Sequence, residues 1–293
     1  MAGGLARRAT IIESYRQKKG PLLLIDAGKV FPISQLNNPR LRAKLSLKIM
    51  DRMEYDALNM ANNELSFGEK FLEDACADLS FPIVTSNLVD KISGHAWGRK
   101  YLIKEKGGIT VAILGIMPAN TSPRSRTSYS NLTVIPPEEA LKTLLPEVKA
   151  KADLVVLLSS CGVDETICLV NQIAGIDLAI ASGKKGFKGN SLDNPTPVMQ
   201  AGGKRVGVFR ITFSEDGSIA NKENEFVFLG ETVASDESVE KMIKEDLSEK
   251  ALAKWQSEQK AKQEARKKGI EELQKLSPME YIELIQQKNQ LKK

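Results

Sequence analysis

Four segments of the sequence end an apolar run in small, amide, hydroxyl or basic residues. They read IDAGK (25–29), NMANNE (59–64), LLSSCG (157–162) and IASGKKG (180–186). Where strands and helices alternate, the carboxyl ends of parallel strands meet at one edge of a sheet, and ligands bind there. Ammonium and amide groups at such an edge hold phosphate or another small anion, and the candidates are Lys29, Asn62, Asn63, Lys184 and Lys185. The alternative is that these are ordinary surface side chains without a ligand.

The elements that must position these ends follow from apolar spacing. Helical spacing predicts helices over 5–17, 41–53, 68–79, 136–152 and 162–176. Continuous apolar runs predict strands buried on both faces at 22–25, 153–160 and 177–183, with short strands at 56–60 and 81–88. Asp164 is expected to cap the helix that follows it. The segment 101–116 reads as a hairpin turning at Gly107-Gly108, and the later segments 196–202, 205–218 and 225–230 read as antiparallel strands.

This order of elements predicts an α/β fold with layered sheets covered by helices. The 293 residues are 42% hydrophobic and 27% charged, which is typical of a folded globular chain of one large domain or two smaller ones. The net charge of +5 comes without interleaved aromatic and basic residues, so we expect no nucleic-acid partner. No apolar run reaches the roughly 18 residues of a membrane span, and the first residues show no signal peptide. The cysteines, Cys76, Cys161 and Cys168, form neither a disulfide framework nor a zinc motif.

The composition changes after about Thr232. Residues 232–293 are charged and almost free of glycine and proline, and an apolar stripe marks their first part: Val239, Met242, Ile243, Leu247 and Trp255. We therefore expect one domain over 1–231 and a long, charged C-terminal helical extension over 232–293. Two interpretations of the helix 236–293 stay open: a solvated linker, or a surface for a protein partner or for self-association.

A series of ordered blocks resembles the bacterial 5′-nucleotidase family of the calcineurin-like metallophosphoesterases. The blocks are GGLARRATIIESYR, LLLIDAG, MDRMEYDALNMANNELSFG, FPIVTSNL, LVVLLSSCGVDE, AGIDLAIASG and VMQAGGKRVGVFRITF, over roughly residues 3–215. The resemblance implies a metallophosphoesterase-like sheet sandwich in 1–231, with the family's first strand, which ends in D-x-H, missing here. It also implies hydrolysis of phosphate esters by two divalent ions, such as Zn, Mn or Mg, that clamp the attacking and leaving oxygens.

The first family positions that bear this chemistry hold other residues here. By the resemblance, Lys29 stands where an aspartate bridges the two ions, and an ammonium there would repel a divalent ion at close range. Asn62 keeps an asparagine ligand of the metal site. Asn63 stands in place of the catalytic histidine, so we expect no catalytic residue at this position.

The later ligand positions are altered as well. Ser160 replaces a ligand histidine, and the final pair of ligand histidines falls among residues that include Lys184 and Lys185. The whole chain has one histidine, His95, which lies in a glycine-rich loop that matches none of the ligand positions. We therefore expect no metal and no other cofactor.

Two functions from different classes follow. The first is a degenerate nucleotidase-like protein without two-metal phosphoesterase activity, which acts in binding or scaffolding and takes a small anion. The alternative is a residual metal-dependent hydrolase of nucleotides or other phosphate esters, with Asp26, Asn62, Glu64 and Ser160 around a single ion. A redox role for Cys161 is a further hypothesis. By resemblance the location is periplasmic or extracellular, although the residues given carry no signal peptide.

Overall fold

The computed structural model describes residues 4–18, 20–32, 38–121, 131–182, 190–191, 195–200, 202, 204–274 and 279. The chain divides into two units, Met1–Ile243 and Lys244–Lys293. The helices that begin in the first unit are α1 (Leu5–Arg16), α2 (Pro39–Arg52), α3 (Glu69–Cys76), α4 (Pro137–Lys149), α5 (Val163–Gln172) and α6 (Glu237–Asp246), with a short 3-10 helix η1 (Glu64–Phe67). The first five match the predicted helical ranges.

The strands form two larger sheets and two ribbons. The three-stranded parallel sheet holds β1 (Ile25–Asp26), β2 (Ala57–Asn59) and β3 (Ile83–Val84) in that order. The six-stranded sheet has the order β10-β11-β9-β8-β6-β5, with β5 (Tyr101–Lys106), β6 (Ile109–Ile116), β8 (Leu154–Ser159), β9 (Leu178–Ala181), β10 (Asn190–Ser191) and β11 (Val198–Met199). The ribbons pair β12 (Arg205–Phe213) with β13 (Ile219–Phe228), and β4 (Leu88–Asp90) with β7 (Leu132–Val134).

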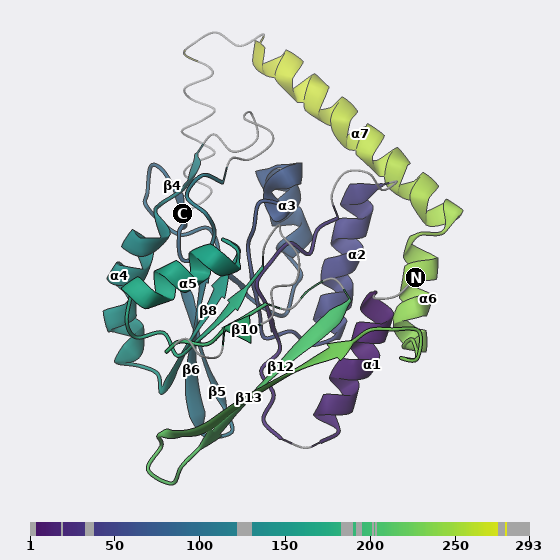
Figure 1. The fold of residues 1–293 in the computed structure, drawn as a ribbon. Coiled ribbons are helices and arrows are strands. Elements are labelled where there is room, and N and C mark those ends of the chain that lie inside the picture. The colour runs from purple at the N-terminus through teal and green to yellow at the C-terminus, as the bar shows by residue number, and fades with distance from the viewer. Residues whose placement is uncertain are drawn as a thin grey trace. The chain divides into compact units, whose positions relative to one another are not determined.

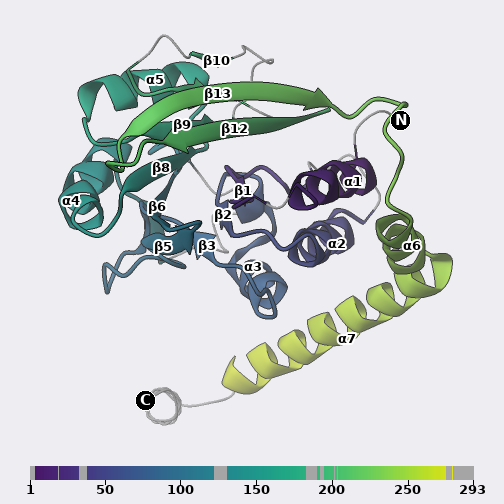
Figure 2. The same cartoon turned by 90° about the horizontal axis from the view of Figure 1, so that it is seen from below.

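The first unit is layered, as Figures 1 and 2 show. Helices α4 and α5 cover one face of the six-stranded sheet, and its other face packs toward the three-stranded sheet. Helices α1, α2 and α3 lie on the outer side of the three-stranded sheet. The fold is therefore the predicted α/β sandwich with sheets covered by helices.

The central strands are buried on both faces because their side chains alternate between two apolar clusters. On β6, Val111 and Ile113 join the cluster between the sheets, whereas Ala112 and Leu114 join the cluster under α4 and α5. All six residues of β8 are buried. Burying a Val, Leu or Ile side chain contributes about 1.5–3 kcal/mol, so these uninterrupted apolar runs hold the layers together.

Several sequence predictions need correction at the level of single elements. The strand predicted at 22–25 is confined to Ile25–Asp26, and residues 22–25 are only half-buried. The segment 81–88 divides between β3 and β4, which belong to different sheets. Strand β11 is antiparallel to β10 but parallel to β9. Helix α5 is capped by Gly162, which takes a φ of 100°, and Asp164 lies in its first turn.

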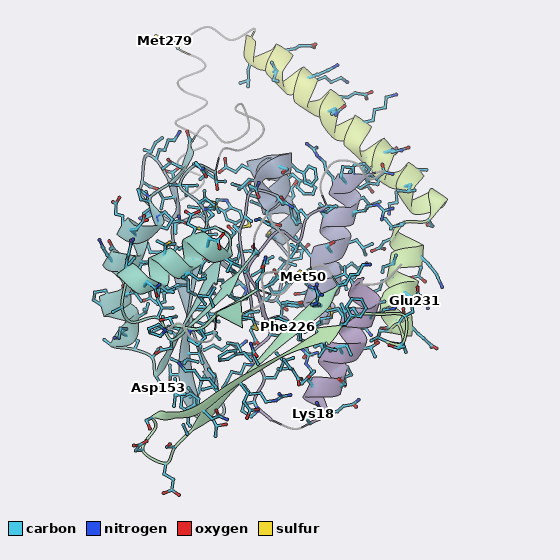
Figure 3. The ribbon with its side chains drawn as sticks, in the orientation of Figure 1. Lys18, Met50, Asp153, Phe226, Glu231 and Met279 are labelled. Atoms are coloured by element: carbon cyan, nitrogen blue, oxygen red, sulfur yellow. The ribbon has the colours of Figure 1, made fainter. Side chains whose placement is uncertain are left out.

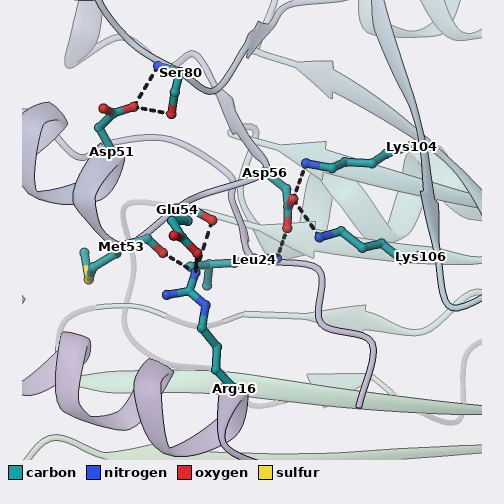
Figure 4. Close-up of polar contacts among 9 residues, drawn as sticks. All are labelled: Arg16, Leu24, Asp51, Met53, Glu54, Asp56, Ser80, Lys104 and Lys106. Atoms are coloured by element: carbon teal, nitrogen blue, oxygen red, sulfur yellow. Dashed lines mark hydrogen bonds and ion pairs between the residues drawn. The ribbon is translucent and has the colours of Figure 1, made fainter. Parts of the chain in front are cut away.

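A buried carboxylate contacts the segment before β1 (Figure 4). Asp56, which precedes β2, accepts a 2.7 Å hydrogen bond from the backbone N–H of Leu24. The same carboxylate pairs with Lys104 and Lys106 of β5, the latter at 3.1 Å. The Leu24 bond adds to the 2.6 Å backbone bond from the N–H of Asp56 to the carbonyl of Leu24. The lysine pairs link the start of β2 to the edge of the six-stranded sheet.

The C-terminal region contains two helices instead of the single helix expected. Helix α6 ends at Asp246 and α7 (Glu249–Gln274) begins after Ser248, whose side chain and N–H both bond to the carbonyl of Glu245. Val239, the first residue of the predicted apolar stripe, is buried. None of the helices in the part of the chain that the structure describes is long and apolar enough to cross a bilayer. The boundary at 231/232 stays a prediction.

The start of α6 offers a test with a defined pH dependence. Asp236 accepts a 2.8 Å bond from the N–H of Val239, and bonds from Ser238 and Val239 lower the pKa of the Asp236 carboxyl below its ordinary 3.8. A lowered folded-state pKa means that the cap stabilises above pH 3.8 and loses this effect as the pH falls through the folded pKa.

We expect Asp236→Ala to cost about 1 kcal/mol at pH 7, and less as the pH falls below 3.8. Urea unfolding at pH 7 and at a pH below 3.8 measures this difference in the free energy of unfolding. Asp236→Asn is the matched control, because it keeps a capping oxygen that does not titrate. If Asp236→Ala lowers the free energy of unfolding equally at both pH values, the Asp236 carboxylate does not cap α6 as inferred.

Candidate site at the strand ends

The strand ends that the sequence singled out meet around one buried amide. Asn59, at the end of β2, is fully buried, and its Nδ2 donates to the carbonyls of Ile116 at 2.9 Å and Leu158 at 3.0 Å. The same group lies 3.4 Å from the carbonyl of Ala27, just after β1. One side chain thus ties the ends of β1, β2, β6 and β8 together across both sheets.

Ser182 brings the end of β9 to the same place. Its N–H donates to the carbonyl of Ser159 at 2.7 Å, and its hydroxyl donates to the carbonyl of Ala27 at 3.0 Å. The Nζ of Lys29 lies 3.5 Å from the carbonyl of Ser182. The predicted convergence of IDAGK, LLSSCG and the start of IASGKKG is therefore present.

Lys29 is held in an unusual backbone conformation. It has a φ of 70°, in the left-handed region that costs a non-glycine residue of order 1 kcal/mol or more, and it follows Gly28 with a φ of 93°. Its N–H donates to the carboxylate of Glu64 at 3.1 Å. This anchored backbone places the ammonium between the ends of β1 and β9.

The buried carboxylate of Glu64 holds two loops together by accepting backbone N–H groups from both. It is 1% exposed and accepts N–H groups from Lys29 at 3.1 Å, Phe31 at 3.0 Å and Ala61 at 2.9 Å. Burial raises the pKa of Glu64 to about 7, against the lowering effect of these donors. Both carboxylate oxygens are occupied by the two loops, so the expected role of Glu64 as an ion ligand is not supported.

The two asparagines that follow β2 differ in their contacts. Asn63 is half-buried and donates from Nδ2 to the carbonyl of Phe31 at 3.2 Å. Asn62 is also half-buried, and its backbone carbonyl accepts the hydroxyl of Ser66 at 3.1 Å. Glu64 links this loop to Lys29. Asn62 and Asn63 therefore neighbour Lys29 through shared loop contacts.

The remaining predicted positions contribute less to an open site. Ser160 is 3% exposed, and its hydroxyl donates to the carbonyl of Ile116 at 3.3 Å. Burial raises the pKa of the Cys161 thiol to about 12, so a thiolate is scarce at neutral pH and the redox hypothesis loses its basis. Lys184 and Lys185 lie outside the described residues.

Sequence reasoning missed an arginine that belongs to the site. Arg8 of α1 pairs with Asp26 at 3.6 Å, and Asp26 also accepts the N–H of Gly28 at 2.9 Å. Burial raises the pKa of Asp26, and the charge of Arg8 opposes that rise. The available signal was spacing, since Leu5, Arg8 and Ile12 share one face of α1 and a cation interrupts an otherwise apolar stripe.

A cleft of about 760 Å³ opens beside these residues. Its walls come from α1, α2, β1, the end of β9, β11 and the β12–β13 ribbon, and it reaches Lys29 and Ser182. Met50 of α2 is among the lining residues, and Lys18 lies just beyond the C-terminal end of α1 (Figure 3). Asn62, Asn63 and Ser160 are not part of its lining.

The donor set does not fit a metal centre. Within the described ranges, no three His, Cys, Asp or Glu residues are grouped so that they could hold an ion. The carboxylate of Asp26 is engaged by Arg8 and Gly28, and that of Glu64 by three N–H groups. We therefore derive no catalytic step through a metal.

Comparison with known proteins places this arrangement in a wider class. No family model matches the chain. The 5′-nucleotidase of Vibrio cholerae is 27% identical over 169 residues, which cover 54% of this chain and 30% of that protein. The uncharacterized metallophosphoesterase YunD of Bacillus subtilis is 27% identical over 163 residues, 55% of this chain and 35% of that protein. The calcineurin-like phosphoesterase YfkN of Bacillus subtilis superposes with a TM-score of 0.69 at 21% identity, over 83% of this chain and 88% of that structure.

The chain has the calcineurin-like metallophosphoesterase fold. Its sequence relatives and structural neighbours include proteins named 5′-nucleotidase, to which the chain is similar at 27% identity or less. The chain spans about a third of the length of the two curated relatives named above.

One expectation is overturned by these relatives. We expected no metal cofactor, but the chain is related to metallophosphoesterases, whose catalysis depends on metal ions. The expectation rested on lost ligand side chains at single positions, and such losses do not establish that the protein works without metal. The relatives imply a metal, while the described residues offer no grouped ligands for one.

Proposed function

We propose that the chain is a nucleotidase-like protein that binds a phosphate group or another small anion at its strand ends, in a binding or scaffolding role. The observation that carries this is the charge of the cleft. Among the lining residues that the structure describes, four cations, Arg8, Lys29, Lys204 and Arg205, face one carboxylate, Asp26, which gives these residues a net charge of four minus one, or +3. A cleft lined by one sign of charge focuses its field and concentrates ions of the opposite sign.

The loop after β2 supports binding without hydrolysis. An asparagine amide does not gain or lose a charge by titration near neutral pH, so Asn63 cannot act as a general acid or base. Its Nδ2 is already bonded to Phe31. We infer that two-metal hydrolysis of phosphate esters is lost. The alternative, a residual metal-dependent hydrolase of nucleotides or other phosphate esters, is favoured by the naming of relatives as 5′-nucleotidases.

The remaining sequence predictions belong to the same proposal. Asn62, Asn63, Lys184 and Lys185 would complete the anion site around Lys29. The extension 236–293 would carry the protein partner or self-association surface, beyond a metallophosphoesterase domain over 1–231. A periplasmic or extracellular location is inferred from the family resemblance.

The test of this function is the affinity for inorganic pyrophosphate, measured by titration calorimetry. A charge-assisted hydrogen bond contributes about 1.5–3 kcal/mol, so Lys29→Ala is expected to weaken binding roughly 10- to 100-fold. Lys142→Ala is the matched control, because Lys142 is an exposed lysine of α4 and the change in net charge is equal. Absence of pyrophosphate binding, or equal affinity in both variants, would overturn the proposal.

A second assay separates the two functions. Purified protein is incubated with excess Mn²⁺ and Zn²⁺, desalted, analysed for bound ions per chain, and tested for AMP hydrolysis. We expect no turnover. Turnover that disappears on chelation would replace the binding role with the hydrolase.

A further inference from the structure

Strand β5 forms one edge of the six-stranded sheet, away from the cleft. Within the described residues β5 pairs with β6 alone, and none of its residues lines the cleft. Leu102 and Ile103 of β5 are half-buried, whereas Ile113 and Ala112, which lie opposite them on β6, are fully buried. An open edge that carries apolar side chains is a template for a strand of another molecule, including a second copy of this chain.

Two lysines of β5 point inward and stay charged at this edge. By strand alternation, Lys104 and Lys106 share the side of β5 that carries Leu102, which packs on the apolar cluster between the sheets. Both ammonium groups pair with the buried carboxylate of Asp56 (Figure 4), and this side therefore has a net charge of two minus one, or +1. Neither lysine can turn away without weakening the pairing of a buried carboxylate, so the ammonium groups are held in place.

Antiparallel pairing of β5 with its own copy would set lysines opposite each other. Residues that face each other in such a pair point to the same side of the sheet. A pairing centred on Lys104 sets this residue opposite its copy, and one centred on Glu105 sets Lys104 opposite Lys106. A pairing centred on Ile103 sets Lys106 opposite Lys100, which immediately precedes the strand. Like charges directly opposite each other destabilise a strand pair, so each of these three registers is disfavoured.

We propose that Lys104 and Lys106, held inward by Asp56, prevent β5 from pairing with a second copy of this chain. Inward-pointing charges protect an edge because an added strand would have to cover them. The half-buried apolar side chains of β5 would otherwise favour association at this edge. The inference goes beyond anion binding, since it involves none of the residues that line the cleft, and it stands if pyrophosphate does not bind.

The test replaces both lysines in the full chain, as Lys104→Thr with Lys106→Thr. Asp56→Asn is added so that no buried carboxylate is left unpaired. The matched control combines Asp56→Asn with Lys142→Ala and Lys149→Ala, two exposed lysines of α4, and has the same net charge. Sedimentation equilibrium measures self-association, and we expect it to be at least tenfold tighter in the β5 variant than in the control. Equal self-association of the two variants would overturn the proposal.

Hydrogen exchange locates the contact and also tests the unaltered chain, which does not depend on how the variants fold. Exchange at 101–106 of the β5 variant should slow as its concentration rises, and slowing confined to other elements would contradict the proposal. In the unaltered chain, raising NaCl from about 0.1 M to about 1 M shortens the screening length from about 10 Å to about 3 Å. This is less than the roughly 5 Å between opposed residues, so exchange at 101–106 of the concentrated chain should slow as well. Unchanged exchange there in about 1 M NaCl would overturn the proposal.

Discussion

Replacing Gly115 by alanine is expected to destabilise the first unit by at least about 3 kcal/mol, beyond the usual range for one added methyl group in a core. A Cβ at this position of β6 would lie 2.3 Å from the carbonyl oxygen of Val84 and 2.6 Å from Oδ1 of Asn59. The closest atom is backbone, so the overlap is relieved only if β3 moves away from β6. That movement would also strain the 2.6 Å bond from the N–H of Ser86 to the Gly115 carbonyl.

Thermal and urea unfolding measure this effect. For a domain of this size, 3 kcal/mol corresponds to a fall in Tm of about 6–12 °C. Gly20→Ala is the matched control, because a Cβ there meets no atom within 4 Å and Gly20 does not take a left-handed φ. Its stability should stay within about 0.5 kcal/mol of the parent. A parent-like Tm for Gly115→Ala would show that the two sheets are less closely packed than their contacts indicate.

Glu64→Ala is the second change with a large expected effect. It removes the acceptor of three backbone N–H groups, those of Lys29, Phe31 and Ala61, in a nearly inaccessible position. Each buried donor left without an acceptor costs about 1–3 kcal/mol. We expect a loss of about 4 kcal/mol in total, together with weaker pyrophosphate binding because the Lys29 backbone is released.

The pH dependence of this loss has a defined sign. Burial raises the pKa of Glu64 from 4.5 to about 7, so the folded state binds the proton more tightly than the unfolded state. The resulting stabilisation is full below pH 4.5 and is lost as the pH rises through about 7. Urea unfolding should therefore give a larger cost for Glu64→Ala at pH 5 than at pH 8.

The control for this series is Glu73→Ala on α3, where the side chain is 51% exposed and pairs only with Lys70 at 3.7 Å among the described contacts. A surface pair of this kind contributes about 0–1 kcal/mol. If Glu64→Ala costs no more than Glu73→Ala, the three N–H bonds do not hold the loops as inferred.

The sequence predicted the central strands well because burial on both faces leaves a local signature. An uninterrupted apolar run such as LVVLLS needs no knowledge of its neighbours, and β8 has the predicted place and burial. The meeting of the strand ends was also predictable, because parallel strands deliver their carboxyl ends to one edge. The hydroxyl of Ser182 on the carbonyl of Ala27 is a direct result of that geometry.

What the sequence could not supply depends on contacts between distant segments. Glu64 looks like an exposed polar residue after a strand, and only the folded loops show it bonded to Lys29 and Phe31. Leu24 reads as part of a strand, but the carboxylate of Asp56 takes its N–H. Arg8 was not identified as a site residue because the sequence does not show that the carboxylate of Asp26 lies beside it.

The length of helix α7 sets the distance between the segments at its two ends. It runs for 26 residues, and at 1.5 Å per residue it extends about 39 Å along its axis. Residues 256–269 offer no large apolar side chain for a neighbour to cover. A continuous helix of this length sets the distance between its two ends, whatever each end binds. Removing seven residues from this stretch would shorten that separation by about 10.5 Å, which is close to two helical turns, and would return the far end to nearly the same rotational setting.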